Sequence, residues 1–165
     1  MMAFSHRTMR SAAEYRLMLD LHGAYWPTGL NRTGPHFMTQ ERLLGAEYNE
    51  WGRRITQTHD VILPFIRMLI GPRDYTPGGF RNATAPPAFA PCFTAPSVMG
   101  TRAYQLAMFV VYESPVQMLA DSPDAYDRAA GADFQSLVPA SWDETPRLAG
   151  AIGEYIVLAR CSGTT

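Results

Sequence analysis

Two glutamates six residues apart are the first candidates for chemistry. Glu41 lies in "MTQER", and Glu47 directly follows the apolar stretch "LLGA". A carboxyl group that leaves an apolar wall loses hydration, which disfavours its anion and raises its pKa. A carboxylic acid that keeps its proton near neutral pH can act as a general acid. On spacing alone, Glu47 could equally be a surface glutamate that begins a helix.

The spacing of Glu41 and Glu47 also admits a metal site. Six residues match neither one face of a helix nor a simple strand period, so a loop or strand bend would have to bring the two carboxylates together. Ca²⁺ takes oxygen ligands at about 2.3–2.6 Å and could collect one or both carboxylates. The spacing is therefore compatible with Ca²⁺ held by one or both carboxylates.

Two further polar residues follow apolar segments in the same manner. His22 stands in "DLHG" and Asp74 in "GPRDYTPG". In barrels of alternating strands and helices, reactive groups lie at the C-terminal ends of the strands, because the loops there line one face. A histidine satisfied by a neighbouring carbonyl explains His22 equally well. His22 and Asp74 are candidate substrate-binding residues.

Aromatic residues flank these positions. Trp26, Tyr25 and Tyr75 offer faces against which a sugar ring could stack. Ordinary aromatic packing is the competing interpretation for all three. Trp26 is the candidate substrate contact among them.

Composition limits the class of protein. The 165 residues are 47% hydrophobic, which is enough apolar surface to bury a core, and the net charge is −1. Without a basic patch or an acidic tail, nucleic acid is not an expected partner. The apolar stretches are too short for a membrane span, so no membrane partner is expected. Cys92 and Cys161 match no zinc spacing and form no disulfide framework.

The first half of the chain alternates helical and extended patterns, with Pro- and Gly-rich loops between them. The predicted elements are a helix over 5–16 with Ser5 as N-cap, a strand over 17–22, a strand over 42–46 that delivers Glu47, a helix over 60–70 with Asp60 as N-cap, and a short strand over 71–75.

The second half begins with a proline-rich stretch and ends differently from the first. The predictions are a long surface loop over 77–100, a helix over 101–114 with its apolar face at 103, 106, 107, 110 and 111, a strand over 116–121, a broken helix over 123–138, and an antiparallel hairpin over 141–161.

This order predicts an α/β fold with parallel strands. A complete (β/α)8 TIM barrel needs about 250 residues, so the chain would hold about the last four strands of one. If these strands close into a (β/α)8 barrel, residues 1–140 form its C-terminal half. Residues 141–165 would begin a C-terminal antiparallel β domain. Half a barrel has open edges, so it should fold poorly alone.

The segments "LDLHGAYWPTGLNRTGPHFMTQERLLGAEYNEW", "VILPFIRMLIGPRDYTPGGF", "TRAYQLAMFVVYESPVQMLADSP" and "WDETPRLAGAIGEYIVLAR" together resemble glycoside hydrolase family 97. The resemblance implies a calcium-dependent α-glucosidase or α-galactosidase with a (β/α)8 barrel. It implies that Glu47 is the general acid, that Glu41 binds calcium and that His22 contacts sugar hydroxyls. It also implies an oligosaccharide or α-glycoside substrate and a bacterial periplasmic or extracellular location.

One position separates the branches of that family. The inverting α-glucosidases carry a glutamate directly after the histidine, whereas this sequence has Gly23. The resemblance therefore implies a retaining, α-galactosidase-like enzyme whose aspartate nucleophile lies in a missing N-terminal part of the chain, so that the 165 residues alone would be inactive. The alternatives are an inverting α-glucosidase, a non-catalytic carbohydrate-binding remnant and a metal-stabilised interaction module.

Overall fold

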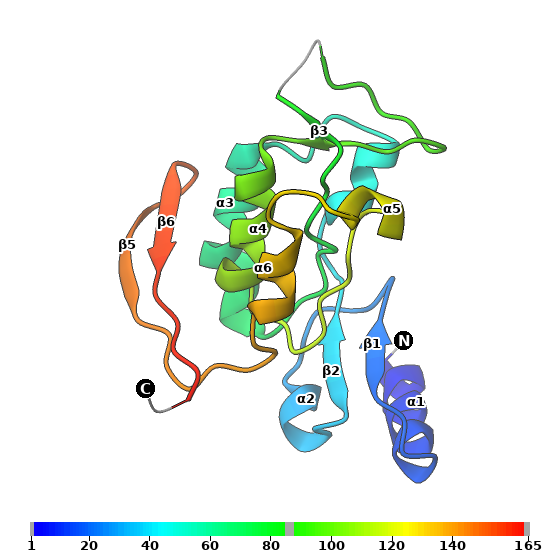
Figure 1. Ribbon diagram of the computed structural model, residues 1–165. Helices are drawn as coiled ribbons and strands as arrows, with labels where there is room; N and C mark the ends of the chain where they lie inside the picture. The colour runs from blue at the N-terminus through cyan, green and yellow to red at the C-terminus, as the bar shows by residue number, and fades with distance from the viewer. Residues whose placement is uncertain (1, 85–87, 164–165) are drawn as a thin grey trace.

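A computed structural model describes residues 2–84 and 88–163. Its N-terminal part is helix α1 (Met2–Glu14) followed by strands β1 (Leu19–Leu21) and β2 (Phe37–Gln40), which pair in parallel (Figure 1). The short helix α2 (Leu30–Thr33) lies between the two strands in sequence. The predicted strand over 17–22 is confirmed in its centre. Ser5 is not the N-cap, because the helix-favouring residues Met2 and Ala3 extend α1 past it.

The predicted strand over 42–46 is wrong. The strand ends at Gln40, and Arg42 has φ 40°, which an extended chain cannot adopt. Leu43 and Leu44 pack against the core from a loop, and the 3₁₀ helix η1 (Ala46–Glu50) follows. Glu47 therefore stands in the first turn of a short helix and not at the end of a strand.

Helix α3 (Gln57–Ile66) begins earlier than the sequence indicates and continues into the 3₁₀ helix η2 (Arg67–Ile70). Its N-cap is Thr56, whose hydroxyl accepts a hydrogen bond from the His59 N–H at 3.2 Å. Asp60, the predicted cap, lies inside the helix and is buried. Asp60 was predicted to be the N-cap, but Thr56, four positions earlier, is the N-cap.

The segment 71–75 forms hydrogen bonds on both sides without becoming a regular strand, so that prediction is wrong in detail. The Asp74 N–H donates to the Gln40 carbonyl (3.3 Å), and the Arg73 N–H donates to the Glu113 carbonyl (3.0 Å). Residues 116–121, also predicted as a strand, form bends in which the Ala120 N–H donates to the Pro77 carbonyl at 3.0 Å. Prolines 115 and 123 border this segment and limit ladder formation.

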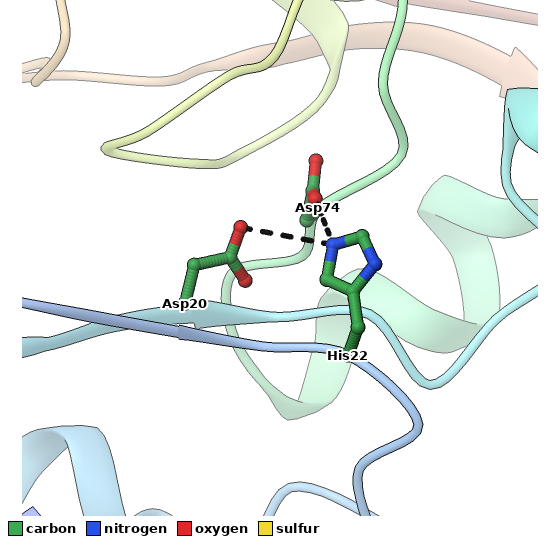
Figure 2. Close-up of side chains that lie close together, drawn as sticks. All are labelled: Asp20, His22 and Asp74. Carbon is green, nitrogen blue, oxygen red and sulfur yellow. Dashed lines mark hydrogen bonds and ion pairs between the residues drawn. The ribbon is translucent and has the colours of Figure 1, made fainter.

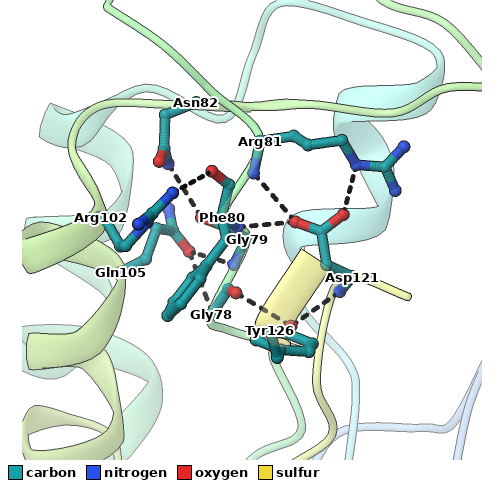
Figure 3. A network of polar contacts seen from close by, with 9 residues as sticks. All are labelled: Gly78, Gly79, Phe80, Arg81, Asn82, Arg102, Gln105, Asp121 and Tyr126. Atoms are coloured by element: carbon teal, nitrogen blue, oxygen red, sulfur yellow. Dashed lines mark hydrogen bonds and ion pairs between the residues drawn. The ribbon is translucent and has the colours of Figure 1, made fainter. Parts of the chain in front are cut away.

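The proline-rich stretch 77–100 is only partly a surface loop; its residues 85–87 lie outside the described residues. It contains strands β3 (Asn82–Ala83) and β4 (Val98–Met99), which pair in parallel. Figure 3 shows its first residues held by a polar network: Asp121 accepts from the Phe80 and Arg81 N–H groups, and the Tyr126 hydroxyl donates to the Gly78 carbonyl. Buried Phe80 and Phe89 make this stretch part of the core.

Helix α4 (Arg102–Val111) forms as predicted, but its buried face is different. Ala103 and Ala107 are exposed, whereas Gln105, Met108 and Phe109 are buried. The Gln105 side chain accepts hydrogen bonds from Gly78 and Gly79, which explains why a polar residue faces inward.

The remaining elements agree with the sequence. The broken helix is α5 (Pro123–Tyr126) and α6 (Ala132–Leu137), and the hairpin is β5 (Arg147–Ala151) with β6 (Tyr155–Leu158). In Figure 1 this hairpin lies beside α3 and α4, which β6 contacts. The described residues thus form a mixed α/β structure with two parallel strand pairs and one antiparallel pair. Among them no helix is long and apolar enough to cross a bilayer, and both cysteines are free thiols.

Candidate active site

His22 and Asp74 come from separate segments and form a close pair (Figure 2). His22 follows β1, and its Nε2 atom lies 2.6 Å from Oδ2 of Asp74. The Asp74 side chain is only 1% exposed, whereas the His22 side chain is 48% exposed. The Asp74 Oδ1 atom accepts a hydrogen bond from the Thr76 N–H (3.2 Å). The hydrogen bond from Thr76 thus fixes the buried Asp74 carboxylate, and the His22 ring is half exposed to solvent.

Asp20 joins this pair, and the sequence interpretation missed it. It lies on β1, two residues before His22, and both side chains point to the same side of the chain (Figure 2). Its Oδ2 atom lies 3.9 Å from His22 Nε2, and both of its carboxylate oxygens are buried without a hydrogen-bond partner. The "DLH" spacing was the signal that could have identified it.

The acidic residues change the pKa values of this cluster. Burial raises the pKa of Asp20 from 3.8 to about 6, and the negative charge of Asp74 acts in the same direction. For His22, desolvation lowers the pKa, but the hydrogen bond and charge of Asp74 outweigh it, so the pKa is raised overall. His22 is therefore protonated over a wider pH range than a free imidazole.

Glu41 and Glu47 lie near the same cluster. The Glu41 Oε2 atom accepts a hydrogen bond from the Gly23 N–H at 2.9 Å, directly after His22. Glu47 is exposed, yet desolvation and then the like charge of Glu41 raise its pKa, while the charge of His22 opposes them. The charge of Glu41 thus raises the pKa of Glu47 and the charge of His22 lowers it, while the role of Glu47 as general acid stays a prediction.

One group of potential metal ligands is found among the described residues, and it does not contain Glu41. It consists of Asp20, His22 and Asp74, whose ligand atoms lie within 4.8 Å of one another. His22 supplies a nitrogen already bonded to Asp74, whereas Ca²⁺ prefers oxygen ligands. The geometry of this group suits a hydrogen-bonded cluster better than a calcium site.

Comparisons with known proteins point to one enzyme family. The family model for glycoside hydrolase 97 matches residues 1–43. A retaining alpha-galactosidase from Bacteroides thetaiotaomicron is 45% identical over 99% of the chain, and a probable retaining alpha-galactosidase from Streptomyces bingchenggensis is 39% identical over 93%. The chain therefore corresponds to a fragment of a glycoside hydrolase family 97 protein. The resemblance seen in the sequence is therefore confirmed.

Solved structures agree with this family 97 assignment. A family 97 enzyme from Pseudoalteromonas sp. strain K8, in complex with acarbose, matches 94% of the chain with a TM-score of 0.82 and 36% identity. A beta-arabinopyranosidase matches 94% with a TM-score of 0.79 and 26% identity. The chain spans 25% and 22% of the lengths of the two curated relatives, and 23% of the acarbose-bound enzyme.

Of the aromatic residues predicted to contact a sugar, Trp26 is exposed and Tyr75 is buried. Trp26 is 52% exposed and lines a shallow pocket with Leu21 and Gln40, the residues that precede His22 and Glu41. The Arg42 guanidinium lies 5.0 Å from the centroid of its ring. Tyr75 is only 2% exposed, so the suggestion that it stacks against a sugar is wrong.

A buried arginine joins the segments that carry the candidate site, and sequence reasoning missed it as well. Arg67 donates hydrogen bonds to the carbonyls of Gln40 (3.0 Å), Gly71 (3.0 Å) and Pro72 (3.2 Å). These carbonyls belong to the segments that carry Glu41 and Asp74. A single basic residue within the apolar run "FIRMLI" was the only signal.

Proposed function

We propose that the chain is part of a retaining glycoside hydrolase that cleaves α-linked galactosides, with Glu47 as its acid/base residue. The 45% identity over 99% of the chain with a retaining alpha-galactosidase is the observation that carries the proposal. Desolvation and the charge of Glu41 raise the pKa of Glu47, which suits the acid/base role. The two curated relatives named as retaining alpha-galactosidases support the substrate class. The longer protein that would contain this chain is called the parent protein below.

The reaction would proceed in two steps. In the first, an aspartate of the parent protein outside these residues attacks the anomeric carbon, the glycosidic C–O bond breaks, and Glu47 gives its proton to the departing oxygen. In the second, Glu47 takes a proton from water as the water attacks the same carbon and releases the sugar from the aspartate. The first step needs a carboxylic acid that is still protonated near neutral pH, and a raised pKa provides this.

Gly23 supports the retaining branch. It has φ +59°, a conformation that favours glycine, and a Cβ added there would meet no atom within 4 Å. Backbone conformation, and not crowding, therefore favours glycine here. The space next to His22 stays open in the position where the inverting branch carries its glutamate.

The other site residues would bind the sugar. His22, fixed by Asp74 and half exposed, would donate a hydrogen bond to a hydroxyl group. Exposed Trp26 offers an apolar face next to this position. Asp74 is buried beneath His22, so it would act on the substrate through the imidazole.

Calcium fits Glu41 as a ligand, together with ligands from the rest of the parent protein. The Glu41 carboxylate is partly exposed and faces the like charge of Glu47, which a divalent cation would relieve. Bound there, calcium would supply positive charge beside the sugar and hold Glu41 in place.

The architecture of the parent protein follows from the same proposal. Residues 1–140 would form the C-terminal half of its (β/α)8 catalytic barrel, and the hairpin of β5 and β6 would begin a C-terminal β domain over 141–165. The parallel pairs β1–β2 and β3–β4 are consistent with this arrangement. A periplasmic or extracellular bacterial location is proposed on the family relationship alone.

The test is Glu47→Gln in the parent protein, assayed on α-galactosides with activated aryl and with sugar leaving groups. The variant should lose roughly 10²-fold or more in kcat/KM on the sugar leaving group, which needs a proton, and far less on the aryl one. Glu50→Gln, in the same 3₁₀ helix, is the matched control and should keep both rates. Equal activity of the Glu47 variant on both substrates would remove the assignment.

An inverting α-glucosidase is the second candidate; its substrate class is suggested by the family 97 enzyme that is 36% identical to this chain and forms complexes with acarbose and panose, a trisaccharide of α-linked glucose. NMR of the first product anomer from an α-galactoside and an α-glucoside distinguishes the two. A product that first forms with the α configuration supports retention, and one with the β configuration supports inversion.

A further inference from the structure

Tyr75 links the two halves of the proposed active site, although it touches no substrate position. Its ring is 2% exposed and packs in a core cluster with Ala46, Leu63 and Tyr112. The Tyr112 ring stands nearly edge-on to it, with centroids 5.0 Å apart. The Tyr75 hydroxyl donates a hydrogen bond to Oδ1 of Asp60 on α3 at 2.5 Å. The residue is therefore held both by packing and by a buried polar contact.

The backbone of Tyr75 contacts the helix that carries Glu47. The Ala46 N–H donates to the Tyr75 carbonyl at 2.9 Å, one residue before Glu47. The fit is close, because a Cβ added at Gly45 would lie 2.9 Å from that carbonyl oxygen. A shift of the Tyr75 backbone would consequently move the start of η1.

The same residue follows Asp74 directly in the chain. Asp74 is hydrogen-bonded to His22, and its own N–H donates to the Gln40 carbonyl, one residue before Glu41. A displacement of Tyr75 would therefore move His22, through the bonded Asp74, and Glu47, through the hydrogen bond to Ala46. Among the described residues, only Tyr75 is both adjacent to Asp74 in sequence and hydrogen-bonded through its backbone to Ala46, the residue before Glu47.

Asp60 is a firm anchor for the Tyr75 hydroxyl. It lies within helix α3 and is 3% exposed, and its main-chain carbonyl accepts a hydrogen bond from the Tyr112 hydroxyl at 2.9 Å. The Tyr104 hydroxyl reaches its Oδ2 atom at 3.3 Å. Loss of the Tyr75 hydroxyl would leave Oδ1 of a buried carboxyl without that donor, which favours local rearrangement.

We propose that Tyr75, anchored by Asp60, is a positioning residue that sets the place of Glu47 relative to the His22–Asp74 pair. The proposal rests on the proposed role of Glu47. Proton transfer is sensitive to the position of the acid, so a small displacement of η1 affects substrates that need the proton and spares those that do not.

The experiment compares Tyr75→Phe with Tyr112→Phe in the parent protein. Both substitutions remove one buried hydroxyl bonded to Asp60 from the same cluster, so both should lower the melting temperature. Only Tyr75 contacts the residue before Glu47. The readout is the ratio of kcat/KM for an aryl α-galactoside to that for a galactosyl disaccharide, which global loss of folded protein leaves unchanged.

For Tyr75→Phe this ratio should rise by roughly tenfold to 10²-fold, as expected for a misplacement on the order of 1 Å. For Tyr112→Phe it should stay at the wild-type value. Equal ratios in the two variants overturn the proposal, even when Glu47→Gln behaves as an acid/base variant. A wild-type parent protein that cleaves no glycoside overturns the proposed function instead.

A second pair of variants covers the case in which Tyr75→Phe does not fold. Asp60→Asn keeps an oxygen that accepts from the Tyr75 hydroxyl, whereas Asp60→Leu has a similar size and no acceptor. The leucine variant should raise the ratio and the asparagine variant should leave it near wild type. A wild-type ratio in the leucine variant overturns the role of the anchor.

Discussion

The Nε2 atom of His22 lies 2.6 Å from Oδ2 of Asp74, so a half-exposed imidazole stands on a carboxylate that is almost completely buried. The hydrogen bond and the negative charge of Asp74 raise the pKa of His22 against the effect of desolvation, which lowers it. The substitution Asp74→Asn removes the negative charge beside His22, whereas the desolvation of the imidazole, which lowers its pKa, remains. The pKa of His22 should therefore fall.

NMR titration of the imidazole in the parent protein measures this change. Asp124→Asn, on α5, is the control and should leave the His22 titration unchanged. Because the folded-state pKa of His22 is raised, its protonation stabilises the fold at low pH, and this contribution is lost as the pH rises through the folded-state value. An unchanged His22 pKa in Asp74→Asn would show that Asp74 does not control the ring.

Asp60 gives a prediction about stability and pH. Burial raises its pKa from 3.8 to about 7, although the hydrogen bonds from Tyr75 and Tyr104 and the charge of Arg73 lower it. The folded state then holds a proton that the unfolded state releases, so the free energy of unfolding should fall as the pH rises from 3.8 to about 7. Asp60→Asn cannot ionise and should flatten this slope.

Denaturant unfolding of the parent protein and of Asp60→Asn across this pH window tests the prediction. Asp124→Asn again serves as the control, because this residue lies outside the buried cluster, and it should keep the wild-type slope. Identical slopes for wild type and Asp60→Asn would mean that Asp60 does not hold a proton in the folded protein.

The contact between Gly45 and the Tyr75 carbonyl predicts a position that does not accept a side chain. In Gly45→Ala the new Cβ would lie 2.9 Å from the carbonyl oxygen, closer than real Cβ atoms come. The backbone would have to shift, which should cost about 1–3 kcal/mol of the free energy of unfolding. Gly52→Ala is the control, because its nearest neighbour lies 3.9 Å away. Equal stability of the two variants would show that η1 adjusts without cost.

Calcium binding gives a prediction for Glu41. In the parent protein, isothermal titration calorimetry should show Ca²⁺ binding that a chelator reverses, and Glu41→Gln should bind more weakly because it removes a charged ligand. Glu14→Gln, at the end of α1, should bind as wild type does. Undiminished affinity in Glu41→Gln would place the ion elsewhere.

The sequence predicted the elements whose signals are local. The hairpin of β5 and β6 and the break between α5 and α6 depend on turn residues close in the chain. The wrong strand before Glu47 arose because Leu43 and Leu44 are apolar but pack from a loop. Strand β2 was missed because its buried residues Thr39 and Gln40 are polar, and burial follows from contacts that a single sequence does not display.

The site was predictable in its residue types and only partly in its contacts. Glu41, Glu47 and His22 were chosen as candidates from residue type and spacing; in the structure the charge of Glu41 raises the pKa of Glu47 and the charge of His22 lowers it. The bond between His22 and Asp74 joins residues 52 positions apart, and no periodicity predicts such a distance. Asp20 and Arg67 were missed because a charged residue inside an apolar run gives no sign of its partner.

Arg67 has a mechanical consequence. Its guanidinium joins carbonyls at the end of β2 to carbonyls of the neighbouring segment, so neither can slide without breaking bonds on both. A lysine offers one point charge and could not span them in the same way. The segments that carry Glu41 and Asp74 are therefore braced as one unit, so a change in which sugar the protein accepts is expected to arise from other residues and not from relative movement of these two segments.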